Sequence, residues 1–215
     1  MKKDIIFTGP NRVQLLFRLW SLFYDNPVFQ RPIYGRVHHQ LIKKIKDIKA
    51  DRILDAGCGT GELLLKLARH RPEAEIVGLD LSLEMLQVAR NKDYGITAVY
   101  FIEQSVYSLP FREDSFDLIT NTISSHWYKE FDRAFQEFAR VLKPGGKLLM
   151  ASMSNWGLHH IPGPWQKQLK TLHSTYLSPS IQKEALEKAG FQIISVEAIS
   201  PWPTWLYVAY KPRRI

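Results

Sequence analysis

The sequence has little cysteine and no long apolar run. Cys58 is the single cysteine in 215 residues, so an intrachain disulfide is impossible and a disulfide scaffold is excluded. No stretch of about 18 apolar residues occurs, so we expect no membrane-spanning helix. Only three consecutive apolar residues precede Gly9, too few for the core of a signal peptide. These absences predict a cytoplasmic protein, with peripheral contact at a membrane left open.

Positive charge is concentrated at the two ends of the chain, which has a net charge of +8. Residues 1–50 hold ten Lys and Arg against three Asp, and the tail adds Lys211, Arg213 and Arg214. The middle of the chain is slightly acidic. Basic ends of this kind can steer an anionic partner, such as a lipid headgroup, a nucleic acid or an acidic substrate. A solubilising surface explains them equally well.

Strand and helix patterns alternate from residue 51 onward, in a chain with 45% hydrophobic and 23% charged residues. The alternation predicts an α/β fold with a mostly parallel sheet and helices on both faces. Seven strands are expected, at 52–55, 75–80, 97–103, 116–120, 147–151, 191–196 and 205–210. Helices are expected at 12–24, 33–46, 61–70, 83–90, 129–142 and 180–189. The short connection between the last two strands cannot hold a crossover helix, so we expect the last strand to run antiparallel.

One domain is expected over 1–215, because the length suits a single core and no repeat or linker interrupts it. Residues 1–48 are interpreted as an N-terminal helical lid or arm, and residues 49–153 as a cofactor-binding core. Residues 154–178, rich in His, Trp and Pro, are interpreted as an acceptor-side insertion. Residues 179–215 then supply a C-terminal helix and a strand hairpin.

A glycine-rich loop at 54–61 lies where the first strand becomes the first helix. Glycines there allow a tight turn and let a ligand approach the backbone, but NAD-binding loops share this pattern. Asp80 ends the second strand, where a carboxylate can accept hydrogen bonds from ribose hydroxyls. Asp55 precedes the glycines, where a negative charge would repel a pyrophosphate but would suit a cationic amino-acid group. The two carboxylates favour S-adenosylmethionine over NAD, which leaves an NAD-dependent oxidoreductase as a weaker alternative.

Four motifs occur in order: LDAGCGTG at 54–61, GLDLS at 78–82, LPFREDSFDLI at 109–119 and ARVLKPGGKLLM at 139–150. With them the chain resembles the class I S-adenosylmethionine-dependent methyltransferases, in the branch of the ubiquinone and menaquinone C-methyltransferases. The resemblance implies a Rossmann-like fold with S-adenosylmethionine as cofactor. It implies a cofactor-binding set comprising Tyr24, Asp55, Ala56, Gly57, Gly59, Gly61, Asp80, Leu81, Met85, Ser105, Val106 and Asn121.

Within that set, the resemblance implies different tasks for different residues. Asp55 and the glycines would hold the methionine moiety, and Asp80 the ribose hydroxyls. Leu81 and Met85 would pack on the adenine, although ordinary core packing explains Met85 nearly as well. Asn121 would lie near the sulfonium, and Tyr24 would contact the cofactor from the N-terminal lid.

The chain departs from the family at the adenine end. An acidic residue five positions before the Pro of the LPF motif often caps the adenine amino group in such enzymes, and Ser105 stands there in this chain. The Ser105 hydroxyl can still form a hydrogen bond, and the backbone N–H of Val106 can still reach the ring. The departure leaves open a second class of function, a non-catalytic cofactor-binding regulator or assembly protein.

His126 is the candidate catalytic base or positioning residue, because it follows the fourth strand, at the edge where open α/β sheets bind ligands. Packing or helix capping explains this histidine equally well. Methyl transfer itself depends mostly on proximity and orientation. Candidate residues of the acceptor pocket are Trp20, Trp127, His159 and His160. We expect no metal site, because the histidines and the lone cysteine lack ligand spacing.

The helix expected at 12–24 limits the kinds of acceptor to consider, because apolar residues cover most of the surface of this helix. It either closes over a lipophilic acceptor or lies in a membrane interface; burial within the domain or a dimer is the simpler alternative. We therefore expect a small-molecule acceptor, lipophilic or anionic, such as a polyprenyl quinone, a phospholipid headgroup or an apolar secondary metabolite. A nucleic-acid substrate is disfavoured, although RNA methylation through the basic arm stays open. The oligomeric state is not predicted.

Overall fold

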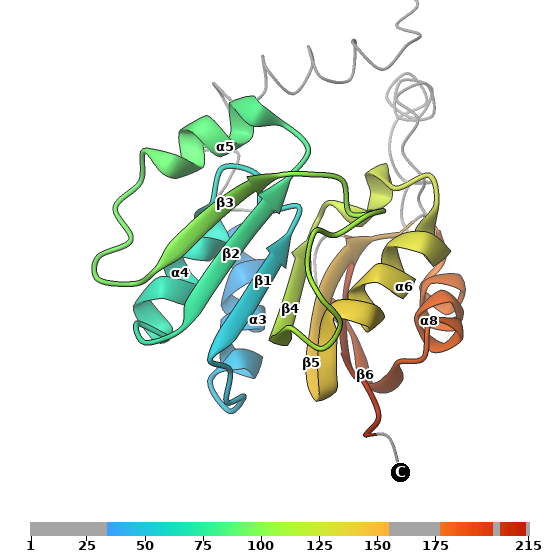
Figure 1. Cartoon of the computed structure of the whole chain (residues 1–215). Helices are drawn as coiled ribbons and strands as arrows, with labels where there is room; N and C mark the ends of the chain where they lie inside the picture. Colours follow the sequence, from blue (N-terminus) through green and yellow to red (C-terminus); the bar gives the residue numbers. More distant parts are fainter. Residues whose placement is uncertain (1–33, 155–176, 200–202, 214–215) are drawn as a thin grey trace, which may run out of the picture.

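The computed structural model describes residues 34–154, 177–199 and 203–213. They form a seven-stranded sheet with the strand order β3-β2-β1-β4-β5-β7-β6 (Figure 1). The strands are β1 (Arg52–Ala56), β2 (Glu75–Asp80), β3 (Val99–Glu103), β4 (Phe116–Thr122), β5 (Leu142–Met153), β6 (Gln192–Ile199) and β7 (Thr204–Tyr210). β7 pairs antiparallel with both of its neighbours, and the other pairings are parallel. The predicted mostly parallel sheet with an antiparallel last strand is confirmed.

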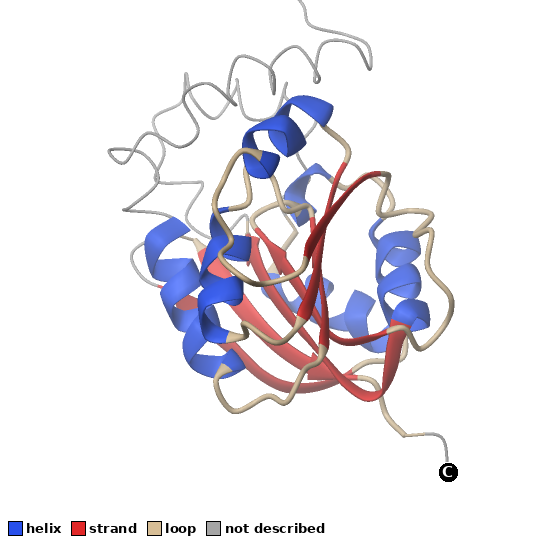
Figure 2. Cartoon of the chain, turned by 60° about the vertical axis from the view of Figure 1, so that its left-hand side comes forward, coloured by secondary structure: helices blue, strands red, loops and turns tan. Residues whose placement is uncertain are grey.

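Helices cover both faces of the sheet (Figure 2). They are α3 (Arg36–Ile45), α4 (Glu62–His70), α5 (Leu83–Arg90), the short 3-10 helix η2 (Ser125–Trp127), α6 (Phe131–Val141) and α8 (Pro179–Lys188). Buried residues of α3, α4 and α5 share one apolar core with the sheet, and those of α6 and α8 share a second core on the opposite face. The two cores hold the carboxyl ends of the central strands in a fixed arrangement.

The helix starts and ends follow local sequence signals. Ser82 caps α5 by accepting a hydrogen bond from the backbone N–H of Met85 at 3.2 Å, as an N-cap serine should. Ser178 caps α8 in the same way through the N–H of Ile181, and Pro179 occupies the first turn. The predicted helix at 129–142 is shorter at both ends, since α6 covers Phe131–Val141.

The strand predicted at 147–151 is longer in the structure, because β5 already begins at Leu142. Residues 143–146 contain a Pro and two glycines, which are typical of the end of a helix. Gly145 adopts a φ of +83°, and its backbone N–H donates to the Lys211 carbonyl at 2.7 Å. The Lys211 N–H in turn donates to the Gly146 carbonyl at 3.0 Å, so the C-terminal segment holds these residues against the sheet.

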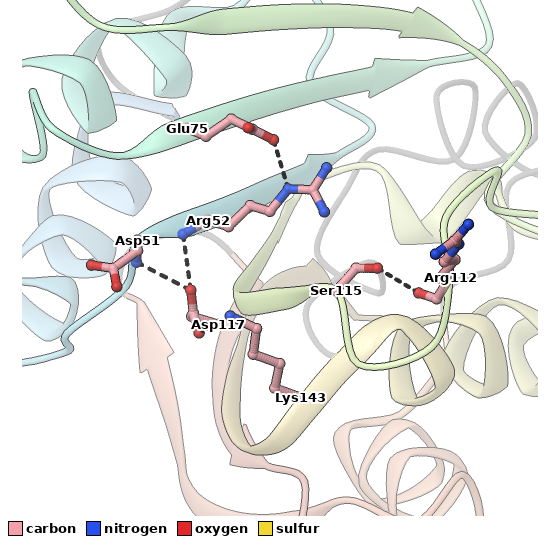
Figure 3. Close-up of polar contacts among 7 residues, drawn as sticks. All are labelled: Asp51, Arg52, Glu75, Arg112, Ser115, Asp117 and Lys143. Carbon is pink, nitrogen blue, oxygen red and sulfur yellow. Dashed lines mark hydrogen bonds and ion pairs between the residues drawn. The ribbon is translucent and has the colours of Figure 1, made fainter.

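A charged junction joins the amino ends of four strands (Figure 3). Asp117 Oδ2 on β4 accepts the backbone N–H groups of Asp51 at 3.1 Å and Arg52 at 2.9 Å. Its other oxygen accepts Lys143 Nζ of β5 at 2.7 Å. The side chain of Arg52 also donates Nε to Glu75 of β2 at 2.6 Å. These bonds fix the register of the strands whose opposite ends carry the candidate site.

Several expectations lie outside the described residues: the helix at 12–24, residues 1–33 of the proposed lid, and residues 155–176 of the proposed insertion. Within the described ranges, no helix is long and apolar enough to cross a membrane.

Candidate active site

The glycine loop follows β1 and is anchored to β2. The backbone N–H groups of Gly57 and Cys58 both donate to the Leu79 carbonyl, at 2.7 and 3.0 Å. Gly57 has a φ of +76°, and a Cβ there would stand 2.5 Å from Ser124 Oγ. Gly59 has a φ of +53°, and no described atom lies within 4 Å of the place where its Cβ would stand. Gly57 is thus required for packing, whereas Gly59 exposes bare backbone to which a ligand can come close.

Asp80, at the end of β2, connects this loop to α5. Its Oδ2 accepts the backbone N–H of Gly59 at 2.8 Å, and its Oδ1 accepts that of Ser82 at 2.9 Å. Burial raises the pKa of Asp80, while these backbone hydrogen bonds oppose the rise. Leu81, next to it, is 61% exposed, and Met85 on α5 is buried. A carboxylate with further acceptor capacity therefore stands beside an exposed apolar side chain, as a ribose and an adenine would need.

Asp55 is completely buried one residue before the end of β1. Thr120 Oγ1 of β4 donates to its Oδ1 at 2.7 Å, whereas Oδ2 has no hydrogen-bond partner among the described residues. Burial, with the charge of Asp80 as a lesser cause, raises the pKa of Asp55 to about 7. A buried carboxylate oxygen without a partner can accept a hydrogen bond from a cationic ligand group. Asp55 therefore fits the α-amino group of S-adenosylmethionine.

Asn121 on β4 lies at the centre of a buried polar cluster. Its Nδ2 donates to the carbonyl oxygen of Ala56 at 2.6 Å and lies 2.7 Å from both Ser124 Oγ and Tyr128 OH. Its Oδ1 has no partner within the part of the chain that the structure describes. The sequence analysis identified Asn121 and missed Thr120 and Tyr128. The signal available was a run of polar residues at the end of an otherwise apolar strand.

His126 lies in η2, is 5% exposed, and its ring centroid is 5.0 Å from that of Trp127. Burial lowers the pKa of His126 to about 4, so the imidazole is neutral near pH 7. A base with so low a pKa abstracts protons weakly. We therefore expect His126 to position other groups rather than to act as a general base.

Ser105 and Val106 lie in the loop after β3, beside the end of β2. The backbone N–H of Gln104 donates to the Asp80 carbonyl at 3.0 Å, and the N–H of Tyr107 donates to Ser105 Oγ at 3.3 Å. Gly61 begins α4 with a φ of +81°. The structure thus brings the core set of predicted cofactor residues to one edge of the sheet. Four predicted residues lie outside the described part of the chain: Trp20, Tyr24, His159 and His160.

Helix α3 and the segment just before it contribute two further residues that the sequence analysis missed. Tyr34, just before the helix, and His38 line a small cavity of about 20 Å³ together with Gly57, Thr60 and Thr122. His38 is buried, and burial and nearby Lys66 lower its pKa to about 3. Lys66 Nζ lies 3.1 Å from His38 Nδ1, which leaves the proton of the neutral ring on Nε2. Among the described residues, no group of three His, Cys, Asp or Glu side chains is arranged to hold a metal ion.

Comparison with known proteins shows the family to which the chain belongs. The model of the methyltransferase domain family matches residues 54–150. Over 192 residues, 87% of this chain and 69% of the relative, the sequence is 31% identical to a malonyl-[acyl-carrier protein] O-methyltransferase of Herminiimonas arsenicoxydans. The chain belongs to the methyltransferase family. This class I methyltransferase uses S-adenosylmethionine as its cofactor, in keeping with the free carboxylate oxygen of Asp55 and the open backbone at Gly59.

Two further relatives match the methyltransferase core over shorter stretches. A demethylmenaquinone methyltransferase of Thermus thermophilus is 39% identical over 100 residues, which are 46% of each chain. A fatty-acid O-methyltransferase of Mycolicibacterium smegmatis is 38% identical over 103 residues, which are 48% of this chain and 37% of the relative. The chain thus spans less than half the length of these two proteins.

The solved structure of the [4+2]-cyclase SpnF shares the fold, with a TM-score of 0.78 and 19% identity over 97% of this chain and 99% of that one. At this identity the likeness concerns the fold alone.

Proposed function

We propose that this methyltransferase transfers a methyl group to a small lipophilic acceptor. When bound, S-adenosylmethionine supplies a methyl carbon activated by a sulfonium. The chain's own residues then have to orient that group, exclude water and place the acceptor in line with it, since proximity and orientation can supply most of the rate enhancement.

In this proposal, different residues at the strand ends bind different parts of the cofactor. The free Oδ2 of Asp55 accepts a hydrogen bond from the α-amino group, and the backbone around Gly59 passes beneath the amino-acid portion. Asp80 accepts hydrogen bonds from the ribose hydroxyls, in addition to those that it already accepts from two backbone N–H groups. Leu81 covers one face of the adenine, and the backbone of Val106 meets its edge.

We infer the class of acceptor from a cavity of about 710 Å³ between α3 and the β6–β7 hairpin. One wall is polar, with Arg36, His39 and Gln40 of α3. The opposite wall is mostly apolar, with Ala198, Ile199 and Leu206; Glu197 also lines it and forms an ion pair with Lys44 at 2.6 Å. Ile199 ends β6, which runs parallel to β5, so this part of the cavity lies at the same edge of the sheet as the glycine loop. Its volume is within the range of small-molecule sites, of roughly 300–1,000 Å³.

Two of the three relatives point in the same direction. A fatty acid and demethylmenaquinone, named as substrates of two of them, are both lipophilic. We infer that the apolar wall holds a hydrocarbon portion of the acceptor and that the polar wall faces its oxygen-bearing head. Contact of residues 12–24 with a membrane surface rests on their sequence alone and would bring such an acceptor within reach.

Transfer of a labelled methyl group to a panel of fatty acids, quinols and polar acids tests this proposal. We expect Ile199→Gln to raise the KM for lipophilic acceptors about tenfold, because it puts an amide into the apolar wall. Ile194→Gln is the matched control, since this residue lies on the same strand and is 54% exposed. Unchanged KM values for the lipophilic acceptors in Ile199→Gln, with S-adenosylhomocysteine affinity intact, would refute the assignment of the cavity.

Removal of residues 1–28 tests the contribution of the N-terminal segment. We expect activity toward lipophilic acceptors to fall while activity toward polar ones persists. Equal activity on both classes after the deletion would contradict a lipophilic acceptor.

A further inference from the structure

Two charged side chains on α6 hold the loop that follows β3. Arg140 donates Nε and Nη2 to the two oxygens of Glu137, at 2.7 and 2.8 Å, and so forms a bidentate ion pair. The same guanidinium donates to the carbonyl oxygens of Phe111 at 2.7 Å and Leu109 at 3.0 Å. Glu137 Oε2 also accepts the backbone N–H of Leu109 at 2.7 Å. One ion pair therefore binds both backbone polar groups of Leu109.

The loop held in this way reaches the adenine end of the proposed cofactor site. At its beginning, the N–H of Gln104 donates to the Asp80 carbonyl at 3.0 Å. Farther along, the N–H of Ser108 donates to the Ser105 carbonyl at 3.2 Å. Residues 105–109 thus form a compact turn between Asp80 and the ion pair. A displacement of Leu109 will be transmitted to Ser105 and Val106 through this turn.

The Glu137–Arg140 pair differs from the ordinary surface ion pairs of this chain. Its side chains are 19% and 30% exposed, whereas those of Glu184 and Lys188 on α8 are 63% and 67% exposed. Exposed pairs contribute little to stability. The α6 pair makes three charge-assisted hydrogen bonds to backbone groups of a single loop, so its effect is directed at the position of that loop.

We propose that Glu137 and Arg140 are positioning residues for adenine recognition. The family resemblance implies an acidic side chain at position 105 that binds the adenine amino group, and this chain has Ser105 there. Ser105 Oγ already accepts the backbone N–H of Tyr107 at 3.3 Å, so we assign recognition of the amino group to backbone groups of residues 105–107, whose placement depends on the α6 ion pair. This inference rests on the proposed function, because it assumes that the adenine binds beside Asp80 and Val106.

Binding of two ligands tests the inference in the full-length protein. S-adenosylhomocysteine carries the adenine amino group, and S-inosylhomocysteine has an oxygen in its place. We expect the wild-type protein to prefer S-adenosylhomocysteine. Arg140→Gln should weaken S-adenosylhomocysteine binding about tenfold, the effect of misplacing one strong hydrogen bond, and bring the two affinities closer together. Arg140→Lys should fall between the two, because an ammonium cannot reproduce the bidentate fork.

Two further variants complete the experiment. Lys188→Gln breaks the exposed pair on α8 and should leave both affinities unchanged. Glu137→Gln keeps an oxygen for the Leu109 N–H while removing the charge, so it provides a milder test if Arg140→Gln does not fold. A lowered melting temperature with an unchanged ratio of the two affinities, in either α6 variant, would show a merely structural pair and overturn the inference. Failure of the wild-type protein to bind either ligand would instead contradict the proposed function.

Discussion

Binding of S-adenosylhomocysteine should depend on pH through Asp55. This carboxyl group is fully buried, its pKa is raised to about 7, and one of its oxygens has no partner among the described residues. A cationic α-amino group placed at that oxygen favours the ionised carboxylate. Binding should therefore lower the pKa of Asp55 and release a proton.

The size of the effect follows from the shift. If binding returns the pKa from about 7 to about 4, the affinity should be about 30-fold lower at pH 5.5 than at pH 8. The stability of the free protein changes with pH in the opposite direction to the affinity. Because the raised pKa belongs to the folded state, Asp55 contributes stability below the ordinary carboxyl pKa of about 4, and this contribution is lost as the pH rises to about 7.

Calorimetry in buffers of different ionisation enthalpy measures both the affinity and the protons released. 5′-Methylthioadenosine is the control ligand, because it keeps the adenine and the ribose but lacks the amino-acid portion, so its binding should not follow Asp55. Asp55→Asn should remove the pH dependence for S-adenosylhomocysteine. A wild-type affinity that is flat between about pH 5.5 and pH 8, with no proton released, would show that Asp55 does not bind the α-amino group.

Three other outcomes follow from the structure. Gly57→Ala should lower the free energy of unfolding by about 1–3 kcal/mol, because a Cβ at φ +76° meets Ser124; Gly59→Ala should lower it by about 1 kcal/mol and chiefly weaken ligand binding. Urea unfolding measures the stability and calorimetry the ligand affinity, and equal effects of the two variants on both quantities would contradict the different roles. Asp117→Asn should destabilise the protein by about 1–3 kcal/mol, since it weakens the bonds to Lys143 and to two backbone N–H groups; an unchanged urea midpoint would contradict this. His126→Gln should lower kcat without removing any inflection of the pH–rate profile near pH 6.5, because burial keeps the imidazole neutral there; loss of such an inflection would establish His126 as the base.

Local sequence signals were sufficient for the elements that form the site. The apolar runs of β1 and β2, the glycines between β1 and α4 and the serine cap of α5 are each encoded within a few residues, and the structure has them at or close to the predicted positions. The two carboxylates, Asp55 and Asp80, could be assigned because each directly precedes or ends such a signal. Their closeness follows from the parallel pairing of β1 with β2.

The remaining features depend on contacts between distant segments, which periodicity does not encode. The start of β5 depends on Lys211, more than 60 residues away, which accepts the N–H of Gly145. Glu137 and Arg140 are ordinary polar-face residues of an amphipathic helix until Leu109 is brought beside them. His38 follows the same rule, since its burial beside Lys66 depends on the packing of α3 against α4.

Calorimetric titration with S-adenosylhomocysteine, with NAD as a control ligand and Asp80→Ala alongside the wild-type protein, tests whether the cofactor binds at the ends of β1, β2 and β4. Binding in the micromolar range that is lost in Asp80→Ala, with no heat from NAD, is the result that a cofactor site at the ends of β1, β2 and β4 predicts. Absence of S-adenosylhomocysteine binding, or binding that survives in Asp80→Ala, would contradict it.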